Sequence, residues 1–282
     1  MLKHDVVIFG TGKITNSLIK KLILNGKSVL CITNNKFGQI DNSLYRNLNI
    51  LSYKEILNTR VESEIVVFSW RNKDALYEND NKLLKWFESG MLHTSKSFFF
   101  SSASVYKESQ FPQSETAQTE KENDKLTLEN VIERLISRTS LLHTNLRISN
   151  VYGKDMSYGF IGSLFESIRH GNEVKIFKDQ NITRDYIHVD DIIGAVEALI
   201  EMNVSNKCLN LSTGIGTSIY QILEIFENYG YKFENRLEIP FPFNVKVTSI
   251  LDCETLSSII KWQPNTLPNV INRLLPQIQK EL

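Results

Sequence analysis

A glycine-rich turn directly follows the apolar run at 6–9 and opens a helical pattern, and it reads Gly10-Thr11-Gly12-Lys13-Ile14-Thr15. Dinucleotide sites need glycine here because the backbone turns tightly and approaches a pyrophosphate, while the next helix supplies N–H groups and a positive dipole. Thr15 stands at the third glycine position of this pattern, where it adds side-chain volume. An ordinary glycine turn is the alternative, so the position between strand and helix carries the prediction.

The second apolar run, 29–32, ends at Thr33-Asn34-Asn35-Lys36. NAD-preferring proteins usually place an acid at this point, where it binds the ribose hydroxyls. No carboxylate stands here, and Lys36 or a small polar pocket would tolerate the 2′-phosphate of NADP. These residues are equally typical of a surface loop, so the choice between NAD and NADP stays open.

A sheet must position these residues. Short apolar runs predict strands at 6–9, 29–32, 65–68, 98–100, 145–148 and 208–211. Helical spacing between them predicts helices, one ending near Gly26 and others around 161–169 and 192–202. Strands that are apolar throughout and alternate with helices are typical of an α/β protein whose parallel sheet is covered on both faces.

The amino-acid composition argues against several classes of protein. Lys and Arg together number 32, and so do Asp and Glu, so the zero net charge disfavours nucleic acid or an anionic membrane as partner. Cys31, Cys208 and Cys253 are odd in number and widely spaced, which indicates free thiols and no zinc site. No signal-peptide pattern or membrane-length apolar stretch occurs. We therefore expect a cytoplasmic protein without a metal.

Several later segments are recognisable as motifs, and they are Ser101-Ser102-Ala103-Ser104-Val105-Tyr106, Leu146-Arg147-Ile148-Ser149-Asn150-Val151-Tyr152-Gly153, Arg184-Asp185-Tyr186-Ile187-His188-Val189-Asp190-Asp191, Asn210-Leu211-Ser212-Thr213-Gly214 and Lys261-Trp262-Gln263-Pro264. In this order they resemble motifs of the extended short-chain dehydrogenases, the NAD-dependent epimerase/dehydratase family. The resemblance covers essentially the whole chain. The run at 184–191 is its most specific part.

The resemblance implies a Rossmann-type, doubly wound parallel sheet with a small C-terminal substrate-binding cap. We expect an NAD(P)-binding domain at 1–154 and mainly the cap at 155–282, with 187–213 returning to the Rossmann domain. The family further implies a nucleoside-diphosphate sugar as substrate, tightly held NAD or NADP, a homodimer, and a role in polysaccharide or deoxysugar synthesis.

Site residues follow from the same resemblance. Ser102 matches the catalytic Ser/Thr that hydrogen-bonds the reacting sugar oxygen, and Lys125 matches the lysine that binds the nicotinamide ribose. Further cofactor contacts are implied at Gly10, Thr11, Gly12, Lys13, Ile14, Thr33, Asn34, Ser69 and Ile148.

On the substrate side, Asn150 and Arg184 match residues that contact the diphosphate, a task that suits the planar guanidinium of arginine. A structural ion pair of Arg184 with Asp185 or Asp190 is the alternative. Further substrate contacts are implied at Ser104, Phe160 and Phe177. His188 is expected to pack and hydrogen-bond within the fold.

The family's base is a tyrosine four residues before the lysine, but Lys121 stands there, and no tyrosine occurs between Tyr106 and Tyr152. Losing a positioned acid/base group typically costs ~10²–10⁴ in rate. In addition, Ser69-Trp70-Arg71 stands where small residues usually face the cofactor, so bulky side chains are expected to narrow that site.

Two interpretations of Lys121 stay open. In the first, Thr119 and Glu122 form a capping box, the helix begins at Glu120, and Lys121 shares a helix face with Lys125. Like-charge repulsion and the helix N-terminus would then favour a neutral amine that replaces the tyrosine. In the second, 120–122 is a solvated charged stretch. The protein would then be a non-catalytic NAD(P)- or nucleotide-sugar-binding protein.

Overall fold

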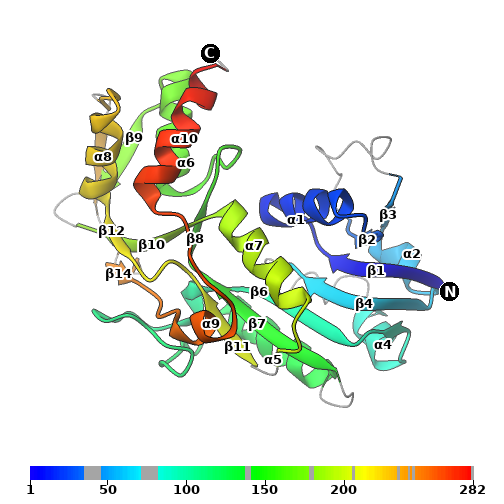
Figure 1. Cartoon of the computed structure of the whole chain (residues 1–282). Helices are drawn as coiled ribbons and strands as arrows, with labels where there is room; N and C mark the ends of the chain where they lie inside the picture. Colours follow the sequence, from blue (N-terminus) through cyan, green and yellow to red (C-terminus); the bar gives the residue numbers. More distant parts are fainter. Residues whose placement is uncertain are drawn as a thin grey trace. The chain divides into compact units, whose positions relative to one another are not determined.

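A central sheet of parallel strands forms the framework, as the apolar runs predict. In the computed structural model its strand order is β11-β7-β6-β4-β1-β2-β3, and β5 pairs with β4 (Figure 1). The strands are β1 Leu2–Phe9, β2 Val29–Ile32, β3 Leu48–Leu51, β4 Val61–Phe68, β5 Leu92–His93, β6 Lys96–Ser102, β7 Leu142–Ile148 and β11 Cys208–Leu211. The structure describes residues 1–34, 46–70, 82–136, 141–177, 181–204, 207–233, 236–240, 242 and 245–280.

The predicted Rossmann-type α/β fold is confirmed. The pairs β1–β2, β1–β4, β2–β3, β4–β5 and β4–β6 are parallel, and each predicted strand lies within an observed one. Every residue of β2 is buried, because helices cover the sheet on both faces. β3 and β5 were not predicted. Only Leu48 of β3 is buried, so this edge strand lacks the continuous apolar run.

Helices lie on both faces of the sheet (Figure 1). On one face lie α1, Lys13–Leu24, and the 193–200 part of α7, Val189–Ile200, which are linked by the Asn25 Nδ2 to Glu197 Oε1 hydrogen bond of 2.6 Å. On the other lie α4, Lys82–Glu88, and α5, Asp124–Ile136. α2, Tyr53–Ile56, follows β3. Apolar residues of β1, β2, β4 and β6 share one buried core with α2, α4 and α5.

The chain divides into two compact units. Unit 1 comprises 1–105, 119–147 and 193–209, and unit 2 comprises 106–118, 148–192 and 210–282. The segments that we expected in the NAD(P)-binding domain but that fall in unit 2 are 106–118, 148–154, 187–192 and 210–213. None of the helices in the described ranges is long and apolar enough to cross a membrane.

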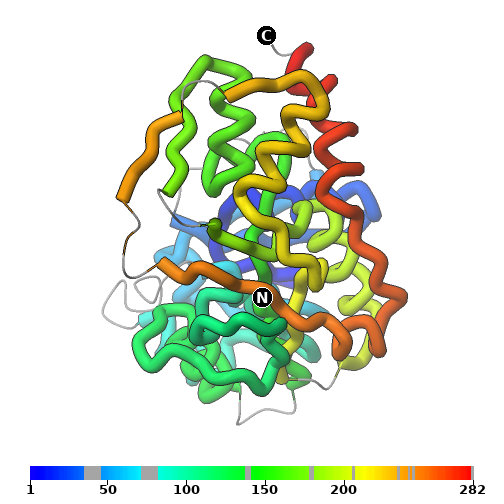
Figure 2. The backbone as a smooth tube through the Cα atoms, turned by 90° about the vertical axis from the view of Figure 1, so that its left-hand side faces the viewer, coloured from blue at the N-terminus to red at the C-terminus, as the bar shows by residue number. Residues whose placement is uncertain are grey.

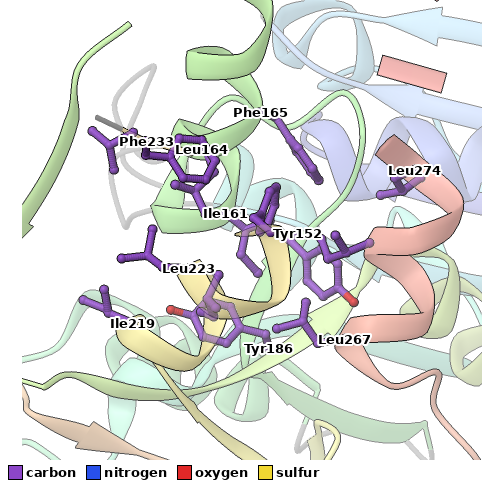
Figure 3. Packing of buried hydrophobic residues seen from close by; sticks show 14 of the residues in the cluster. Tyr152, Ile161, Leu164, Phe165, Tyr186, Ile219, Leu223, Phe233, Leu267 and Leu274 are labelled. Atoms are coloured by element: carbon purple, nitrogen blue, oxygen red, sulfur yellow. The ribbon is translucent and has the colours of Figure 1, made fainter. Parts of the chain in front are cut away.

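Unit 2 has its own small sheets and its own core. Its elements are β8 Asn150–Tyr152, α6 Gly159–His170, β9 Val174–Phe177, β10 Thr183–His188, β12 Gly216–Ser218, α8 Ile219–Asn228, β13 Arg236–Ile239, β14 Thr248–Ser249, α9 Glu254–Ile259 and α10 Leu267–Gln279. β10 pairs with β8, β12 and β14, and β13 pairs with β9. α6, α8 and α10 (Figure 2) share one apolar core with β10, and this core includes Phe165 of α6, Leu274 of α10 and Tyr186 of β10 (Figure 3).

Candidate functional site

The turn between β1 and α1 has the form that the sequence predicts. Gly10 has a φ of +89°, and a Cβ atom placed on it would lie 2.8 Å from the carbonyl oxygen of Ser69. Both the backbone conformation and this close approach exclude a side chain. Gly10 is therefore required by the fold itself, because β1 must pass directly beside the chain that leaves β4.

Gly12 is a glycine for a different reason. Its φ of −177° and ψ of 178° are extended backbone that any residue adopts, and a Cβ atom there would meet nothing within 4 Å. Gly12 is the N-cap of α1, no side chain caps that helix, and no acidic residue lies in its first turn. An uncapped helix N-terminus beside an open glycine fits a diphosphate. The turn therefore fits the dinucleotide that the sequence predicts.

Two pairs of hydroxyl groups flank this turn. Thr11 Oγ1 lies 3.2 Å from Thr33 Oγ1, at the ends of β1 and β2. Thr15 Oγ1 lies 2.8 Å from Ser69 Oγ, and Thr15 is fully buried. The Thr15 side chain, at the third glycine position, is thus buried in the fold, and its hydroxyl is hydrogen-bonded to Ser69. No sequence pattern predicts this pair, because 54 residues separate its members.

Residues near the ends of β2 and β4 also have structural partners. Asn34 Oδ1 accepts a hydrogen bond from the N–H of Tyr53 at 3.0 Å. Trp70 is 2% exposed, donates through Nε1 to the Tyr53 hydroxyl at 2.8 Å, and packs against Phe9 and Phe68. The side chain of Trp70 is therefore part of the apolar core. Arg71, the other bulky side chain that we expected near the cofactor, lies outside the described residues.

Ser102 ends β6 and precedes a short 3-10 helix, Ala103–Val105. Its Oγ accepts a hydrogen bond from the N–H of Ser104 at 3.1 Å, which fixes the hydroxyl at the carboxyl end of β6. Lys13 and Ile14 are both partly exposed in the first turn of α1. Ile148 is buried at the end of β7.

Lys125 lies in the first turn of α5 and reaches the same end of the sheet. Its Nζ donates to the carbonyl oxygens of Phe100, at 2.8 Å, and Trp70, at 2.5 Å. The ammonium also lies 5.0 Å from the centre of the Phe99 ring. Because both carbonyls belong to residues at or next to the ends of β6 and β4, the structure places Lys125 and Ser102 beside the same strand end.

One turn further along α5, a buried ion pair fixes the helix to the sheet. Glu129 accepts from Arg147 of β7 at 2.7 and 3.0 Å and from the Ser101 hydroxyl at 2.5 Å. All three residues are buried. Because the charges are paired and hydrogen-bonded, the network holds α5 in one position against β6 and β7. The position of Lys125 depends on this attachment.

α5 does not begin at Glu120, as the first interpretation of Lys121 requires. The helix begins at Asp124, and Asn123 caps it, with its Oδ1 accepting from the N–H groups of Lys125 and Leu126 at 2.9 and 3.2 Å. The N–H of Glu120 instead bonds to the carbonyl of Val105 at 2.7 Å, which keeps this segment out of the helix. Lys121 is exposed and lies before α5. It therefore does not share a helix face with Lys125.

In unit 2, Arg184 forms no ion pair with Asp185 or Asp190, the two described carboxylates that the structural alternative required. Its guanidinium donates to the carbonyl oxygens of Thr183 at 3.0 Å, of Val247 at 2.8 Å and of Lys246. Burial lowers the pKa of Arg184. A guanidinium that is bound to carbonyl oxygens keeps its positive charge, which suits an anionic ligand, although the carboxylate of Glu108 also acts on this charge and raises the pKa.

Asp185 is the buried carboxylate that organises this strand. It accepts from the N–H and hydroxyl of Thr213, at 3.0 and 2.7 Å, and from the N–H of Gly214 at 2.9 Å. Burial raises the pKa of Asp185, although these hydrogen bonds act in the opposite direction. The backbone carbonyl of Asp185 accepts from the Asn150 side chain at 3.0 Å. Asp185 therefore joins the segments that carry Asn150 and Arg184, a role that sequence reasoning missed.

The remaining predicted residues of unit 2 have mainly packing contacts. Phe160 in α6 and Phe177 at the end of β9 are partly buried against the core of unit 2. His188 is buried, lies edge-on to the Tyr152 ring at 5.3 Å between centroids, and accepts from the N–H of Asp190 at 3.3 Å. Burial lowers the pKa of His188. The predicted packing role of His188 is confirmed. Within the described ranges no cluster of three or more potential metal ligands occurs.

Comparison with solved structures gives the same fold. The UDP-glucuronic acid 4-epimerase of Bacillus cereus, in complex with UDP-glucuronic acid and NAD, matches with a TM-score of 0.82 and 19% identity, and all of both chains is covered. The UDP-glucose 4-epimerase of Thermotoga maritima, with UDP-glucose, matches with a TM-score of 0.79 and 23% identity over 99% of each chain.

Sequence comparison reaches curated relatives over part of their length. The ADP-L-glycero-D-manno-heptose-6-epimerase of Brachyspira hyodysenteriae is 32% identical over 103 residues, which cover 34% of this chain and 32% of that protein. Across the curated relatives the matched part covers 28% to 44% of their length. The model of the "NAD dependent epimerase/dehydratase family" matches residues 6–212, from β1 to the residue after β11. With this match over most of its length and the dinucleotide turn in place, the chain belongs to the NAD-dependent epimerase/dehydratase family.

Proposed function

We propose that the protein binds NAD or NADP at the Gly10–Lys13 turn, with Ser102 and Lys125 at the nicotinamide end. The open position at Gly12 on an uncapped helix is the observation that carries this proposal. Thr11, Thr33, Asn34, Ser69 and Ile148 complete the proposed cofactor contacts. The nicotinamide, when bound, exchanges a hydride with the substrate. The protein's own residues bind and orient it.

For the substrate we propose a nucleoside-diphosphate sugar, contacted by Asn150 and Arg184 at its diphosphate and by Ser104, Phe160 and Phe177 elsewhere. The charge of Arg184 and its carbonyl-bound geometry support this role. So do the nucleotide-sugar substrates in the names of the relatives. The reaction is of the epimerase, dehydratase or reductase class, with Ser102 hydrogen-bonding the reacting sugar oxygen and Lys121 supplying the acid/base group.

A second candidate is a non-catalytic NAD(P)- or nucleotide-sugar-binding protein. The observation that favours it is the position of Lys121, which is exposed and precedes α5. A proton-transferring group must come within hydrogen-bonding reach of the substrate oxygen, and an exposed lysine outside the helix has little to hold it there.

Calorimetric titration with NAD, NADP and a panel of nucleoside-diphosphate sugars, followed by product analysis, separates the candidates. The enzyme proposal expects binding and turnover of at least one sugar, and a fall of about 10²-fold or more in kcat for Lys121→Ala. Binding without turnover across the panel supports the second candidate. Activity that is unchanged in Lys121→Ala contradicts the role of Lys121, and absence of binding contradicts both candidates.

We also propose a homodimer, cytoplasmic location and a place in polysaccharide synthesis, as the family resemblance implies. Light scattering of the purified protein checks the dimer. A single species at the 32.5 kDa mass of one chain would contradict it.

A further inference from the structure

Asn123 makes more hydrogen bonds than a helix cap requires. Its Oδ1 accepts from the N–H groups of Lys125 and Leu126, as an N-cap does. Its Nδ2 donates to the carbonyl oxygen of Ser104 at 3.0 Å and lies 3.5 Å from the Ser104 hydroxyl. Ser, Thr and Asp cap helices about as well as Asn, so capping alone gives no reason for an amide donor.

The donor connects α5 to the loop that carries Ser102. Lys125 bonds to the carbonyl of Phe100, two residues before Ser102, and Asn123 bonds to the carbonyl of Ser104, two residues after it. The first turn of α5 therefore holds the chain on both sides of Ser102. The Ser102 hydroxyl in turn accepts from the N–H of Ser104, so the contact from Asn123 reaches that hydroxyl through one residue.

We propose that Asn123 is a positioning residue that sets Ser102 and Lys125 in register at the nicotinamide end of the site. This inference rests on the proposed function, because it assumes that a nicotinamide dinucleotide binds there. Asn123 acts through its neighbours, since its own side chain is fully engaged by Ser104 and the start of α5.

Two substitutions separate positioning from capping. Asn123→Asp keeps the acceptor that caps α5 and replaces the donor with an oxygen that faces the Ser104 carbonyl. Asn123→Ala removes both functions. Ser218→Ala is the matched control, because Ser218 caps α8 through its side chain and lies in unit 2, outside the proposed cofactor contacts.

Two ligands locate the effect within the cofactor site. NADH or NADPH would occupy both the adenine end and the nicotinamide end of the site, and fluorescence of the reduced nicotinamide reports its binding. ADP lacks the nicotinamide and its ribose, and calorimetry measures its binding. We expect Asn123→Asp and Asn123→Ala to weaken binding of the reduced cofactor by about three- to tenfold. Their affinity for ADP should stay within about twofold of the unmodified protein.

The variants should rank differently in thermal stability than in cofactor affinity. Asn123→Ala and Ser218→Ala should each lower the Tm by about 2–4 °C, and Asn123→Asp should lower it by less than Asn123→Ala, because it keeps the cap of α5 and loses only the bond to Ser104. Ser218→Ala should keep the affinity for the reduced cofactor. Equal cofactor binding by Asn123→Asp and the unmodified protein overturns the inference, and so does parallel weakening of ADP and NADH. If the unmodified protein binds neither reduced cofactor, the proposed function fails and takes this inference with it.

Discussion

At the residue scale, the two glycines of the dinucleotide turn differ in how strongly the fold requires them. Gly10 combines a positive φ with a carbonyl oxygen 2.8 Å from the position of a Cβ atom, so the fold excludes any other residue. Gly12 has neither restriction. A sequence motif shows both as glycine and does not separate them. The structure does, and it assigns the stability cost to Gly10.

We therefore predict opposite phenotypes for two alanine substitutions. Gly10→Ala should destabilise the protein by about 1–3 kcal/mol or more, because it combines an unfavourable φ with a close contact. Gly12→Ala should leave the free energy of unfolding within about 1 kcal/mol. It should nevertheless weaken NADH and ADP alike by about tenfold or more, since a methyl group would stand where the diphosphate approaches. Denaturant unfolding and calorimetry measure both, and normal ADP binding by Gly12→Ala would contradict the site.

His143 should make stability depend on pH. Burial lowers its pKa to about 4, and the neutral ring donates through Nε2 to Asn145 Oδ1 at 3.0 Å and accepts at Nδ1 from the Ser97 hydroxyl at 2.7 Å. In the unfolded chain the His143 ring therefore binds a proton near pH 6.5, whereas in the folded protein it binds a proton only near pH 4. This contribution to stability is complete above pH 6.5 and declines as the pH falls, by at most about 3 kcal/mol.

A neutral substitute tests the sign of this effect. Between pH 7.5 and pH 4.5 the free energy of unfolding should fall less steeply in His143→Gln than in the unmodified protein. Urea titrations at a series of pH values give the two slopes. Parallel curves would show that His143 does not contribute.

At the element scale, α5 shows what sequence patterns leave undecided. Thr119 with Glu122 forms a capping-box pattern, but Asn123 is the cap that the protein uses. Both are local signals for the start of a helix, a capping box in the first case and an N-cap asparagine in the second. Contacts distant in sequence decide between them, namely Glu120 with Val105 and Lys125 with Phe100 and Trp70. The presence of the helix and of Lys125 on it was predictable, and its first residue was not.

The attachment of α5 through Glu129 and Arg147 leads to a prediction about paired charges. Arg147→Met should destabilise the protein by about 3–5 kcal/mol, because it leaves the Glu129 carboxylate buried without its cation. Adding Glu129→Leu should restore much of that loss, since no buried charge then remains. Thermal and denaturant unfolding of the single and double variants measure the coupling. A double variant less stable than Arg147→Met would contradict this account.

At the scale of the whole molecule, the positions of six strands of the central sheet followed from buried apolar runs, whereas the order of the strands and the division into units did not. The loop at 106–118 lies in unit 2 although both of its neighbours belong to unit 1. Its attachment depends on pairs such as Gln113 with Ile250 and Tyr106 with Asn210, which are more than 100 residues apart. Hydrophobic periodicity describes only neighbours in sequence, so it carries no signal for these contacts.

The two units give the proposed ligands separate signatures in hydrogen exchange. The dinucleotide turn, Ser102 and Lys125 belong to unit 1, whereas Asn150 and Arg184 belong to unit 2. A ligand that binds only the folded state slows the opening of the structure that it contacts. NADH should therefore protect the amides around 10–16 and 123–127, and the diphosphate of a nucleotide sugar should protect those around 150 and 184. The Gly12→Ala variant should lose the first pattern and keep the second. If a nucleotide sugar protected only the turn at 10–16, Arg184 and Asn150 would not form its diphosphate site.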